Sequence, residues 1–359
     1  MEIGIIGLPT SGKTTVFNAL TGSDRETSAA STGKLELHSA TVNVPDDRID
    51  QLSTLYKPRK TIYAQVVFTD IAGLDKDLGK KGLSGELRNK IAPMDAFIHV
   101  VRAFEDNRIP HLAQSVNPAR DLNNLDTEFL LADMVTAETR LARIAERLSK
   151  GAKAEERQKL IEDQALFNRL LEALSDGTHL RDVDLTEEEL NGISGYSFLT
   201  LKPVLVLINT GEDDSEQVDI QYKHRHSDVL SMQAKLEMEI SQLAEDEVTF
   251  FMDEFGITDR AVNRVIQAAY KLVNLQSFFT VGEDEVRAWT LPVGATALEA
   301  AGAIHSDLAR GFIRAEVIPY KTLIKAGDMV AARKAGQVQI EGKTYVIHDG
   351  EIVHIRFSV

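Results

Sequence analysis

The chain of 359 residues contains no cysteine, one tryptophan and nine prolines. Without cysteine, it can form neither disulfides nor a thiolate metal site. It has no apolar run long enough to span a bilayer, and no basic N-terminal region followed by an apolar segment and a cleavage site. We therefore expect a cytoplasmic protein without a membrane partner.

A shortage of positive charge limits the partners further. The formal net charge is −15, which argues against a uniformly basic nucleic-acid-binding protein, and we expect no DNA partner. The charge is unevenly spread, so a local basic patch is still compatible with it. The length allows two or three domains, the 43% hydrophobic content supports full cores, and we expect a monomer.

The most informative segment is Gly7 to Thr14, which reads Gly-Leu-Pro-Thr-Ser-Gly-Lys-Thr after the apolar residues 3–6. This pattern predicts a phosphate-binding P-loop between a strand and a helix. Lys13 would reach the β- and γ-phosphates, and the Thr14 hydroxyl would hold Mg²⁺. A plain glycine turn is the alternative, but such a turn has no need of the lysine–threonine pair. We expect the nucleotide-binding residues of this loop to be Gly7, Pro9, Thr10, Ser11, Gly12, Lys13, Thr14 and Thr15.

A second motif is expected beside the P-loop. The apolar residues 65–69 run into Asp70-Ile71-Ala72-Gly73, the D-x-x-G pattern of GTPase-type P-loop proteins. Asp70 would hold Mg²⁺ through water, and the Gly73 backbone N–H would sense the γ-phosphate. The next residue, Leu74, stands where many small GTPases carry a glutamine that orients the attacking water. Leucine has no hydrogen-bonding group, so this predicts slow intrinsic hydrolysis.

Two further strand ends predict where the purine base binds. The strand 203–208 ends in Asn209-Thr210-Gly211-Glu212, an N-x-x-E pattern where guanine-specific GTPases carry N-K-x-D. The strand 229–232 leads into Gln233-Ala234-Lys235, which resembles their S-A-K loop. An amide such as that of Asn209 both donates and accepts, so it can read either purine. Glu212 is one methylene longer than the usual aspartate, which favours ATP over GTP. The predicted base-contacting residues are Asn209, Thr210, Glu212, Gln233, Ala234 and Lys235.

Taken together, these motifs resemble the YchF family, the Obg-like ATPases among the translation-factor-related P-loop GTPases. The resemblance extends over nearly the whole chain and includes the segments 44–48, 57–58, 68–74, 100–106, 126–128, 285–290 and 311–317. It implies an α/β G domain with a mostly parallel sheet flanked by helices, an inserted helical coiled-coil hairpin and a C-terminal β-grasp TGS domain. It also implies Mg²⁺, binding of ATP or GTP, slow hydrolysis and association with ribosomes or ribosomal RNA.

The resemblance assigns hydrolysis to a histidine in the loop after Phe104-Glu105-Asp106, which here is His111. A solvated loop histidine without a catalytic role is the alternative for this position. His99 lies within a predicted strand, and we expect it to be a core residue.

The chain departs from the family pattern in three places. The family has asparagine where Thr10 stands, a different switch sequence over residues 34–38, and a different glycine-rich segment over residues 75–82. These departures affect the expected hydrolysis rate and switch ordering more than nucleotide binding. They indicate a divergent member of the family or a close sister branch.

Helical periodicity predicts the insert. Apolar residues at steps of three and four form one seam, and a second set follows the break at Lys150-Gly151, which together predict an antiparallel hairpin. The members of the two sets are Leu130, Met134, Ala137, Leu141, Ile144 and Leu148, and then Leu160, Phe167, Leu170, Leu171 and Leu174. The hairpin is either a partner-binding arm or a solvated surface feature.

Short strands and one helix predict the C-terminal domain. Strands over 277–281 and 286–290 precede a helix over 297–308 with a Thr296–Glu299 capping-box spacing, and 353–357 form the last strand. This order fits a β-grasp. Arg310, Arg314, Lys321 and Lys325 form either an RNA-facing patch or ordinary surface charge. We place the nucleotide-binding domain at residues 1–122 and 200–274, the insert at 123–199 and the C-terminal domain at 275–359.

Three functional hypotheses follow. The first is an enzyme in which Lys13 and Mg²⁺ neutralise charge on the phosphates while His111, or a group from a partner, replaces the missing glutamine. The second is a GTP-specific GTPase. The third is a nucleotide-sensing ribosome- or RNA-binding adaptor with vestigial hydrolysis.

Overall fold

A computed structural model of the chain describes residues 1–25, 36–72, 83–109, 111, 113–211, 220–254 and 257–358. The predictions for Gly73, Leu74 and Glu212 lie outside these residues. The chain forms two compact units, Met1–Ala40 with Val67–Val262, and Thr41–Val66 with Asn263–Val359. The boundary between the units falls within two strands of the first sheet.

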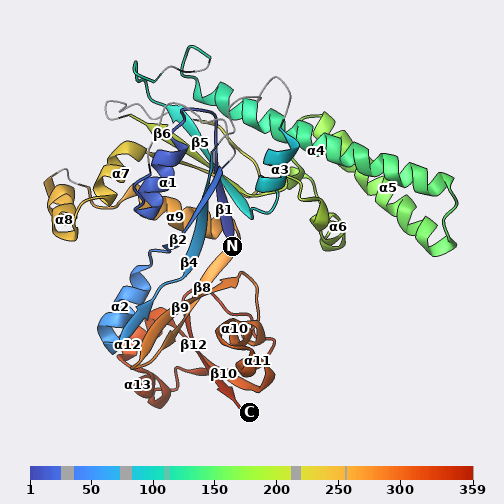
Figure 1. Cartoon of the computed structure of the whole chain (residues 1–359). Coiled ribbons are helices and arrows are strands. Elements are labelled where there is room, and N and C mark those ends of the chain that lie inside the picture. The colour runs from blue at the N-terminus through green and yellow to red at the C-terminus, as the bar shows by residue number, and fades with distance from the viewer. Residues whose placement is uncertain are drawn as a thin grey trace. The chain divides into compact units, whose positions relative to one another are not determined.

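The first unit is built on a six-stranded sheet with the order β2-β4-β1-β5-β6-β7 (Figure 1). The strands β4, β1, β5, β6 and β7 pair in parallel in that succession, which confirms the predicted α/β fold with a mostly parallel sheet. The strands are β1 (Glu2–Ile6), β2 (Glu36–Asn43), β4 (Gln65–Ala72), β5 (Ala96–Ala103), β6 (Val204–Thr210) and β7 (Ser227–Met232).

Helices bury the faces of this sheet. The whole of β5 is buried, as a strand covered on both faces must be. On one face, side chains of α3 and of the first part of α4 share a core with the strands, for example Phe129 against Phe97 at a ring-centroid distance of 5.4 Å. The helices α1 and α7 pack against each other. The helices of the unit outside the insert are α1 (Lys13–Thr21), α3 (Gly85–Ile91), α7 (Ala234–Ser241) and α8 (Glu245–Glu254).

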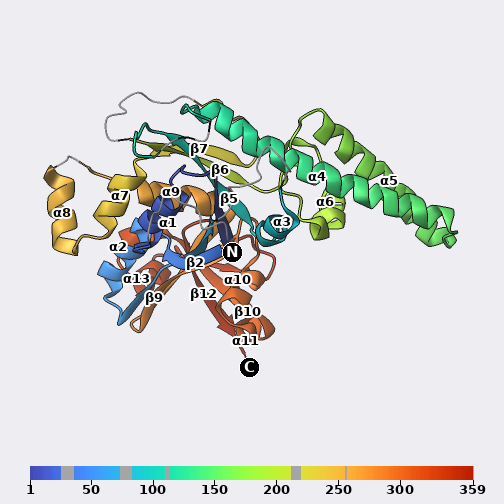
Figure 2. The same cartoon turned by 45° about the horizontal axis from the view of Figure 1, so that its top comes forward.

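The insert is the predicted helical hairpin. The helices α4 (Pro118–Ser149) and α5 (Ala154–Ser175) lie side by side in both views (Figures 1 and 2). Ala137 and Phe167 belong to their shared core, and Gly151, with a φ of 83°, follows the end of α4 as predicted. The helix α4 begins five residues earlier than the predicted insert, because the Asn117 side chain caps it and Pro118 suits its first position. After α5 come η1 (Leu180–Asp182), α6 (Glu187–Ile193) and η2 (Ser194–Tyr196).

The second unit contains a mixed sheet with the order β11-β10-β12-β8-β9-β3. The strands β8 and β9 pair in antiparallel fashion, and β12 pairs in parallel with β8, as the strand pattern of a β-grasp requires. The narrower assignment as a TGS domain stays a prediction. The elements are β3 (Lys60–Ile62), β8 (Leu275–Val281), β9 (Glu285–Pro292), β10 (Phe312–Pro319), β11 (Gln339–Glu341), β12 (Glu351–Phe357), α2 (Asp47–Tyr56), α9 (Ala261–Leu272, which begins in the first unit), α10 (Ala297–Ile304), α11 (Ser306–Arg310), α12 (Tyr320–Ala326) and α13 (Met329–Lys334).

One predicted helix of this unit needs correction. The capping box of Thr296 and Glu299 is present, but the helix that we expected over 297–308 is two helices. It ends at Ile304 because His305 is extended, with a φ of −164°, and the His305 side chain accepts a hydrogen bond from the Asp307 backbone N–H. The His305 side chain caps the start of a second helix, and this breaks the segment that the apolar spacing predicts to be one continuous helix.

The second correction concerns residues 41–66, which we had placed in the nucleotide-binding domain. They belong to the second unit, where β3 pairs in parallel with β9. Asp46 caps α2, and the Arg48 guanidinium donates to Asp46 and, at 2.7 Å, to Asp349. The partners β9 and Asp349 lie more than 200 residues away along the chain, so local sequence patterns do not reveal them.

Within the described ranges, no helix is both long enough and apolar enough to cross a membrane.

Asp133 connects α4 to the chain before β6. It is fully buried, and its carboxylate accepts hydrogen bonds from the backbone N–H groups of Leu199 at 3.0 Å and Thr200 at 2.7 Å, and from the Thr200 hydroxyl. Asp133→Ala would leave these buried donors without an acceptor, which should lower the free energy of unfolding by about 3 kcal/mol. Thermal unfolding checks this, with the exposed Glu138→Ala on the same helix as control. Equal melting temperatures for the two variants would contradict it.

His99 predicts a pH dependence of stability. It is buried in β5, as expected, and burial, with a smaller effect of the Lys13 charge, lowers its pKa to about 3. The unfolded chain binds this proton near pH 6.5, so the stabilisation is complete above that pH and is lost as pH falls toward 3. Between pH 7 and pH 4, wild type should lose about 3 kcal/mol more than His99→Leu.

Unfolding measured across this pH range tests the difference in slope. The control is His305→Leu, since His305 is exposed. If the free energy of unfolding falls equally with pH in wild type and in His99→Leu, the buried imidazole does not titrate in this way.

Candidate functional site

The P-loop runs from the end of β1 to the start of α1. Gly7 has a φ of 152°, and a Cβ there would overlap the backbone carbonyl oxygen of Val100 on β5. Gly12, with a φ of 94°, caps α1, and a Cβ there would overlap the Asn209 amide nitrogen. Glycine is therefore required at both positions by backbone conformation and by space. The loop ends on the positive end of the α1 dipole, a suitable position for phosphate.

Lys13 lies over this loop. Its Nζ donates to the carbonyl oxygens of Gly7 at 3.0 Å and Leu8 at 2.9 Å, and the side chain is largely buried. The ammonium therefore lies inside the P-loop. There its positive charge and the loop N–H groups together make the electrostatic potential of the loop more positive.

The Thr14 hydroxyl, on the first turn of α1, meets the Asp70 carboxylate near the end of β4. Thr14 Oγ1 lies 2.9 Å from Asp70 Oδ2, although 56 residues separate them. Asp70 is 1% exposed, and its Oδ1 is buried without a hydrogen-bond partner among the described residues. A guanidinium nitrogen of Arg25 lies 3.6 Å from Oδ2. Buried oxygens of this kind, one with no donor, fit a hard divalent cation such as Mg²⁺.

Asn209, at the end of β6, connects two loops. Its Nδ2 donates to the backbone carbonyl of Ser11 at 3.0 Å, and its Oδ1 accepts from the Ala234 backbone N–H at 3.2 Å. The side chain is 4% exposed. One N–H and the oxygen of the amide thus hold the P-loop to the start of α7. The predicted reading of a purine by Asn209 depends on its second N–H and on the remaining lone pair of its oxygen.

Register brings the other predicted base-contacting residues to the same edge. Asn209 pairs with Met232, so Thr210 and Gln233 follow neighbouring strand ends. Ala234 is fully buried at the start of α7, whereas Lys235 is exposed and lies 3.9 Å from Glu239. Pro9, Thr10 and Thr15 lie in the P-loop and on the first turn of α1. Sequence therefore predicted which described segments meet at this edge.

Arg102, near the end of β5, was not predicted as a site residue. It is buried, and its guanidinium donates to the Thr10 hydroxyl at 3.3 Å and to the carbonyls of Phe104 and Ile109, both at 3.0 Å. It therefore supports the P-loop and the loop that leads to His111. An arginine inside a strand whose other residues, apart from His99, are apolar was the signal that could have identified it.

His111 lies away from solvent, so the alternative of a solvated loop histidine is wrong. Its side chain is 6% exposed, with Nε2 2.9 Å from Asp121 Oδ2, and its Nδ1 accepts from the Ala113 backbone N–H at 3.1 Å. Both nitrogens are engaged, which places the proton on Nε2. To act on a phosphate, the imidazole would have to leave Asp121.

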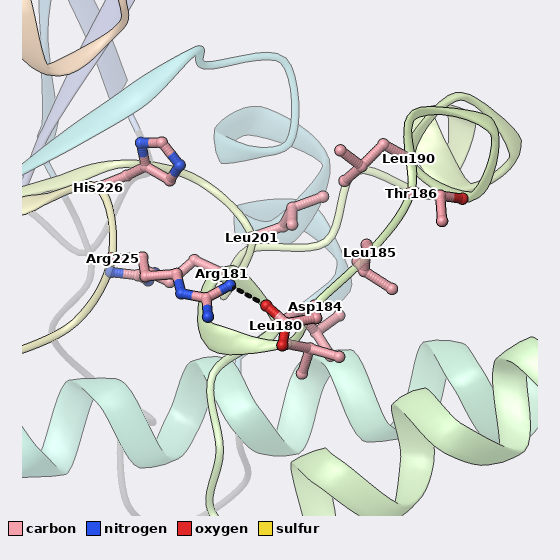
Figure 3. Close-up of a pocket in the computed structure, with 10 residues that line it drawn as sticks. Leu180, Arg181, Asp184, Leu185, Thr186, Leu190, Leu201, Arg225 and His226 are labelled. Atoms are coloured by element: carbon pink, nitrogen blue, oxygen red, sulfur yellow. Dashed lines mark hydrogen bonds and ion pairs between the residues drawn. The ribbon is translucent and has the colours of Figure 1, made fainter.

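A separate hollow of about 460 Å³ lies at the base of the insert (Figure 3). Leucine side chains, including Leu185 and Leu201, line it, and an Arg225–Asp184 ion pair of 2.6 Å crosses one side. None of its lining residues belongs to the predicted nucleotide site.

Comparisons with known proteins match both the N-terminal and the C-terminal parts of the chain. The family model MMR_HSR1, 50S ribosome-binding GTPase, matches residues 2–136, and the model YchF-GTPase_C, a protein of unknown function (DUF933), matches residues 275–358. The Ribosome-binding ATPase YchF of Pasteurella multocida is 40% identical over 365 residues, covering 100% of this chain and 99% of the relative. The protein of the same name from Bacillus subtilis is 39% identical, with 100% of both chains covered.

A solved structure matches over the same length. The Schizosaccharomyces pombe YchF GTPase superposes with a TM-score of 0.83 at 29% identity, covering 99% of this chain and 97% of that one. Full-length identity near 40%, together with the P-loop, the Thr14–Asp70 pair and the shared fold, leads to one conclusion: this chain belongs to the YchF family.

Proposed function

We propose that this chain is a Mg²⁺-dependent nucleoside triphosphatase that acts with the ribosome. The observation that carries the proposal is the Thr14–Asp70 contact of 2.9 Å beside the P-loop, since this pair has a clear purpose at a metal–phosphate site. The names of the bacterial relatives support ATP hydrolysis and ribosome binding. A ribosomal partner also agrees with the cytoplasmic location that we expect.

The chain's own residues would act mainly by positioning and charge. Backbone N–H groups from Gly7 to Thr14 would bind the phosphates, and Lys13 would turn from the loop carbonyls to the β- and γ-oxygens. Thr14 directly and Asp70 through water would hold Mg²⁺, which would supply charge stabilisation as the γ-phosphoryl group leaves. When the metal binds, the Arg25 guanidinium would have to move away from Asp70, because the guanidinium and the metal are both cations.

His111 is the residue that we propose for orienting or deprotonating the attacking water. The paired Asp121 would hold it in the resting arrangement, and release from Asp121 would be the step that a ribosome could control. With Leu74 in place of the usual glutamine, turnover without a partner should be slow.

ATP is the proposed nucleotide, although one relative is named a GTPase. The sequence N-x-x-E lacks the lysine and the shorter carboxylate of the guanine-binding motif. A site that does not satisfy the guanine edge loses its preference for GTP, because unpaired polar groups carry most such discrimination.

The engagement of His111 with Asp121 favours a second candidate, an adaptor that binds nucleotide and ribosome with vestigial hydrolysis. The predicted basic patch is its proposed RNA contact, although one member, Arg310, forms an ion pair of 2.5 Å with Asp307. Single-turnover hydrolysis with and without ribosomes separates the two. Hydrolysis that ribosomes accelerate supports the enzyme, and a turnover unchanged near zero supports the adaptor.

Lys13→Ala should weaken nucleotide binding at least about 100-fold, because it removes the only side-chain cation of the P-loop segment. Equilibrium titration with ATP and with GTP, both with Mg²⁺, measures this, and wild type should bind ATP more tightly. Tighter binding of GTP would mean that Glu212 does reach guanine. The control is Lys235→Ala, which should change base preference more than phosphate affinity.

His111→Ala should lower ribosome-stimulated turnover about 100-fold, in the range of a lost acid–base group, while leaving nucleotide affinity unchanged. The control is His305→Ala, since His305 is an exposed histidine of the second unit. Unchanged turnover in His111→Ala would remove the catalytic role. A lower melting temperature with unchanged turnover would assign His111 to the anchoring of α4 through Asp121.

A further inference from the structure

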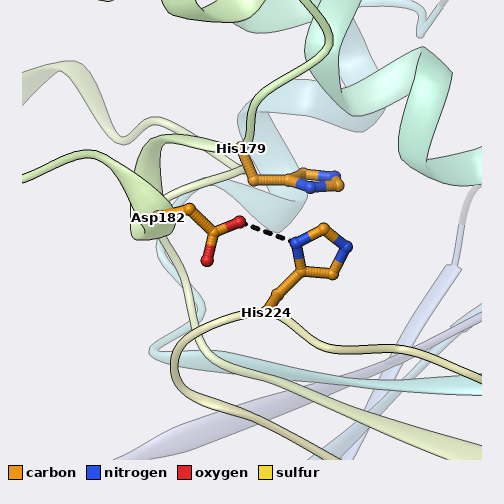
Figure 4. Close-up of side chains that lie close together, drawn as sticks. All are labelled: His179, Asp182 and His224. Atoms are coloured by element: carbon orange, nitrogen blue, oxygen red, sulfur yellow. Dashed lines mark hydrogen bonds and ion pairs between the residues drawn. The ribbon is translucent and has the colours of Figure 1, made fainter.

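Two histidines and an aspartate converge in the first unit, away from the nucleotide site. His179 and Asp182 lie at η1, and His224 lies in the segment before β7 (Figure 4). One ligand atom from each lies within 4.8 Å of the other two. His224 Nδ1 is 2.6 Å from Asp182 Oδ2, and the two imidazole rings are edge to face with centroids 4.4 Å apart.

His179 is the unusual member of this cluster. It is 4% exposed, and both of its ring nitrogens are buried without a hydrogen-bond partner among the residues described. A buried imidazole with no partner for either nitrogen is unfavourable, because each lost its bond to water on folding. A bound ligand, such as a metal ion, would supply the partner that the described residues around His179 do not provide.

The second layer of the cluster resembles that of a metal centre. Asp126 of α4 lies 3.9 Å from His179 Nε2, beyond hydrogen-bond distance, and a shift of about 1 Å would let this carboxylate orient a metal-bound histidine. The Asp126 carboxylate accepts a bond from Tyr222, which in turn accepts one from Arg181. Two carboxylates, Asp126 and Asp182, lie near the one guanidinium of Arg181. Together the two acids can balance more positive charge than that guanidinium supplies.

We infer that His179, Asp182 and His224 form a site for Zn²⁺ or a chemically similar first-row cation. Two imidazoles and one carboxylate match the ligands that zinc prefers, and a water would complete four-coordination. In a tetrahedral site with bonds of about 2.0–2.1 Å, ligand atoms lie roughly 3.3 Å apart. The longest separation within the cluster, at most 4.8 Å, must therefore shorten by up to about 1.5 Å, whereas the 2.6 Å contact between His224 and Asp182 must open. The proton between His224 and Asp182 passes to solvent as the metal binds.

Such a site would join segments that are distant in sequence. His179 and Asp182 follow the insert helix α5, Asp126 belongs to α4, and His224 precedes the edge strand β7. A bound cation would fix the base of the helical insert to the sheet of the same unit. The inference is independent of the proposed nucleotide chemistry, since it shares no residue with that site.

The test is titration of the metal-free full-length protein with ZnCl₂ against a chromogenic chelator, without nucleotide. We expect one Zn²⁺ per chain, a rise in melting temperature on binding, and visible Co²⁺ absorption of a four-coordinate kind. His179→Ala, His224→Asn and Asp182→Asn should each lower the affinity by about 100-fold or more.

The matched control is His226→Asn, an exposed histidine two residues from His224 whose φ of 50° asparagine tolerates. It should bind zinc as wild type does, as should Thr14→Ala, which alters only the nucleotide site. Absence of stoichiometric binding to wild type would overturn the inference, and so would equal affinity in all variants. If His179→Ala does not fold, the near-isosteric Asp182→Asn and His224→Asn decide the result.

Discussion

The parallel pairing of β1 with β4 and β5 is the constraint on which the rest of the site depends. Ile5 pairs with Asp70, Ile6 with His99, and Arg102 with Asn209, so the strands end at one edge in a fixed register. Parallel strands direct their following loops to the same side of a sheet. A register shift of one residue would turn Asp70 and Asn209 to the opposite face and remove both from the P-loop.

Buried polar side chains then hold the loops at that edge. Asn209 ties the P-loop to α7, and Arg102 ties it to the chain that leads to His111. A typical hydrogen bond contributes only about 1 kcal/mol net, but an unmade one in the interior is more unfavourable. These residues therefore fix one geometry for the loops more than they add to overall stability.

Sequence was sufficient wherever the signal is local. The P-loop, the D-x-x-G strand, the hairpin seam from Leu130 to Leu174 and the capping box at Thr296 each depend on spacing within a short segment, and the described parts of each appear as predicted. The partners of Asn209 and the bond from Arg102 to Thr10 arise only when distant loops meet. The hydrogen bond of His111 with Asp121 joins a loop to α4 across ten residues, and no helix or strand spacing predicts it. The pairing of β3 with β9 was missed for the same reason, because no sequence pattern in either strand indicates which strand it pairs with.

The discontinuous second unit has a consequence for biosynthesis. Residues 41–66 include Ile49 and Leu52, which are fully buried in the finished protein, and β3, which needs β9 to pair. During translation this segment leaves the ribosome about 200 residues before its partners, a wait of roughly 10–40 s at 5–20 residues per second. Through that interval the nascent chain carries an apolar helix face and an unpaired strand, surfaces that chaperones recognise. The time at which the second unit can finish folding therefore depends on the rate of translation as well as on its own folding rate.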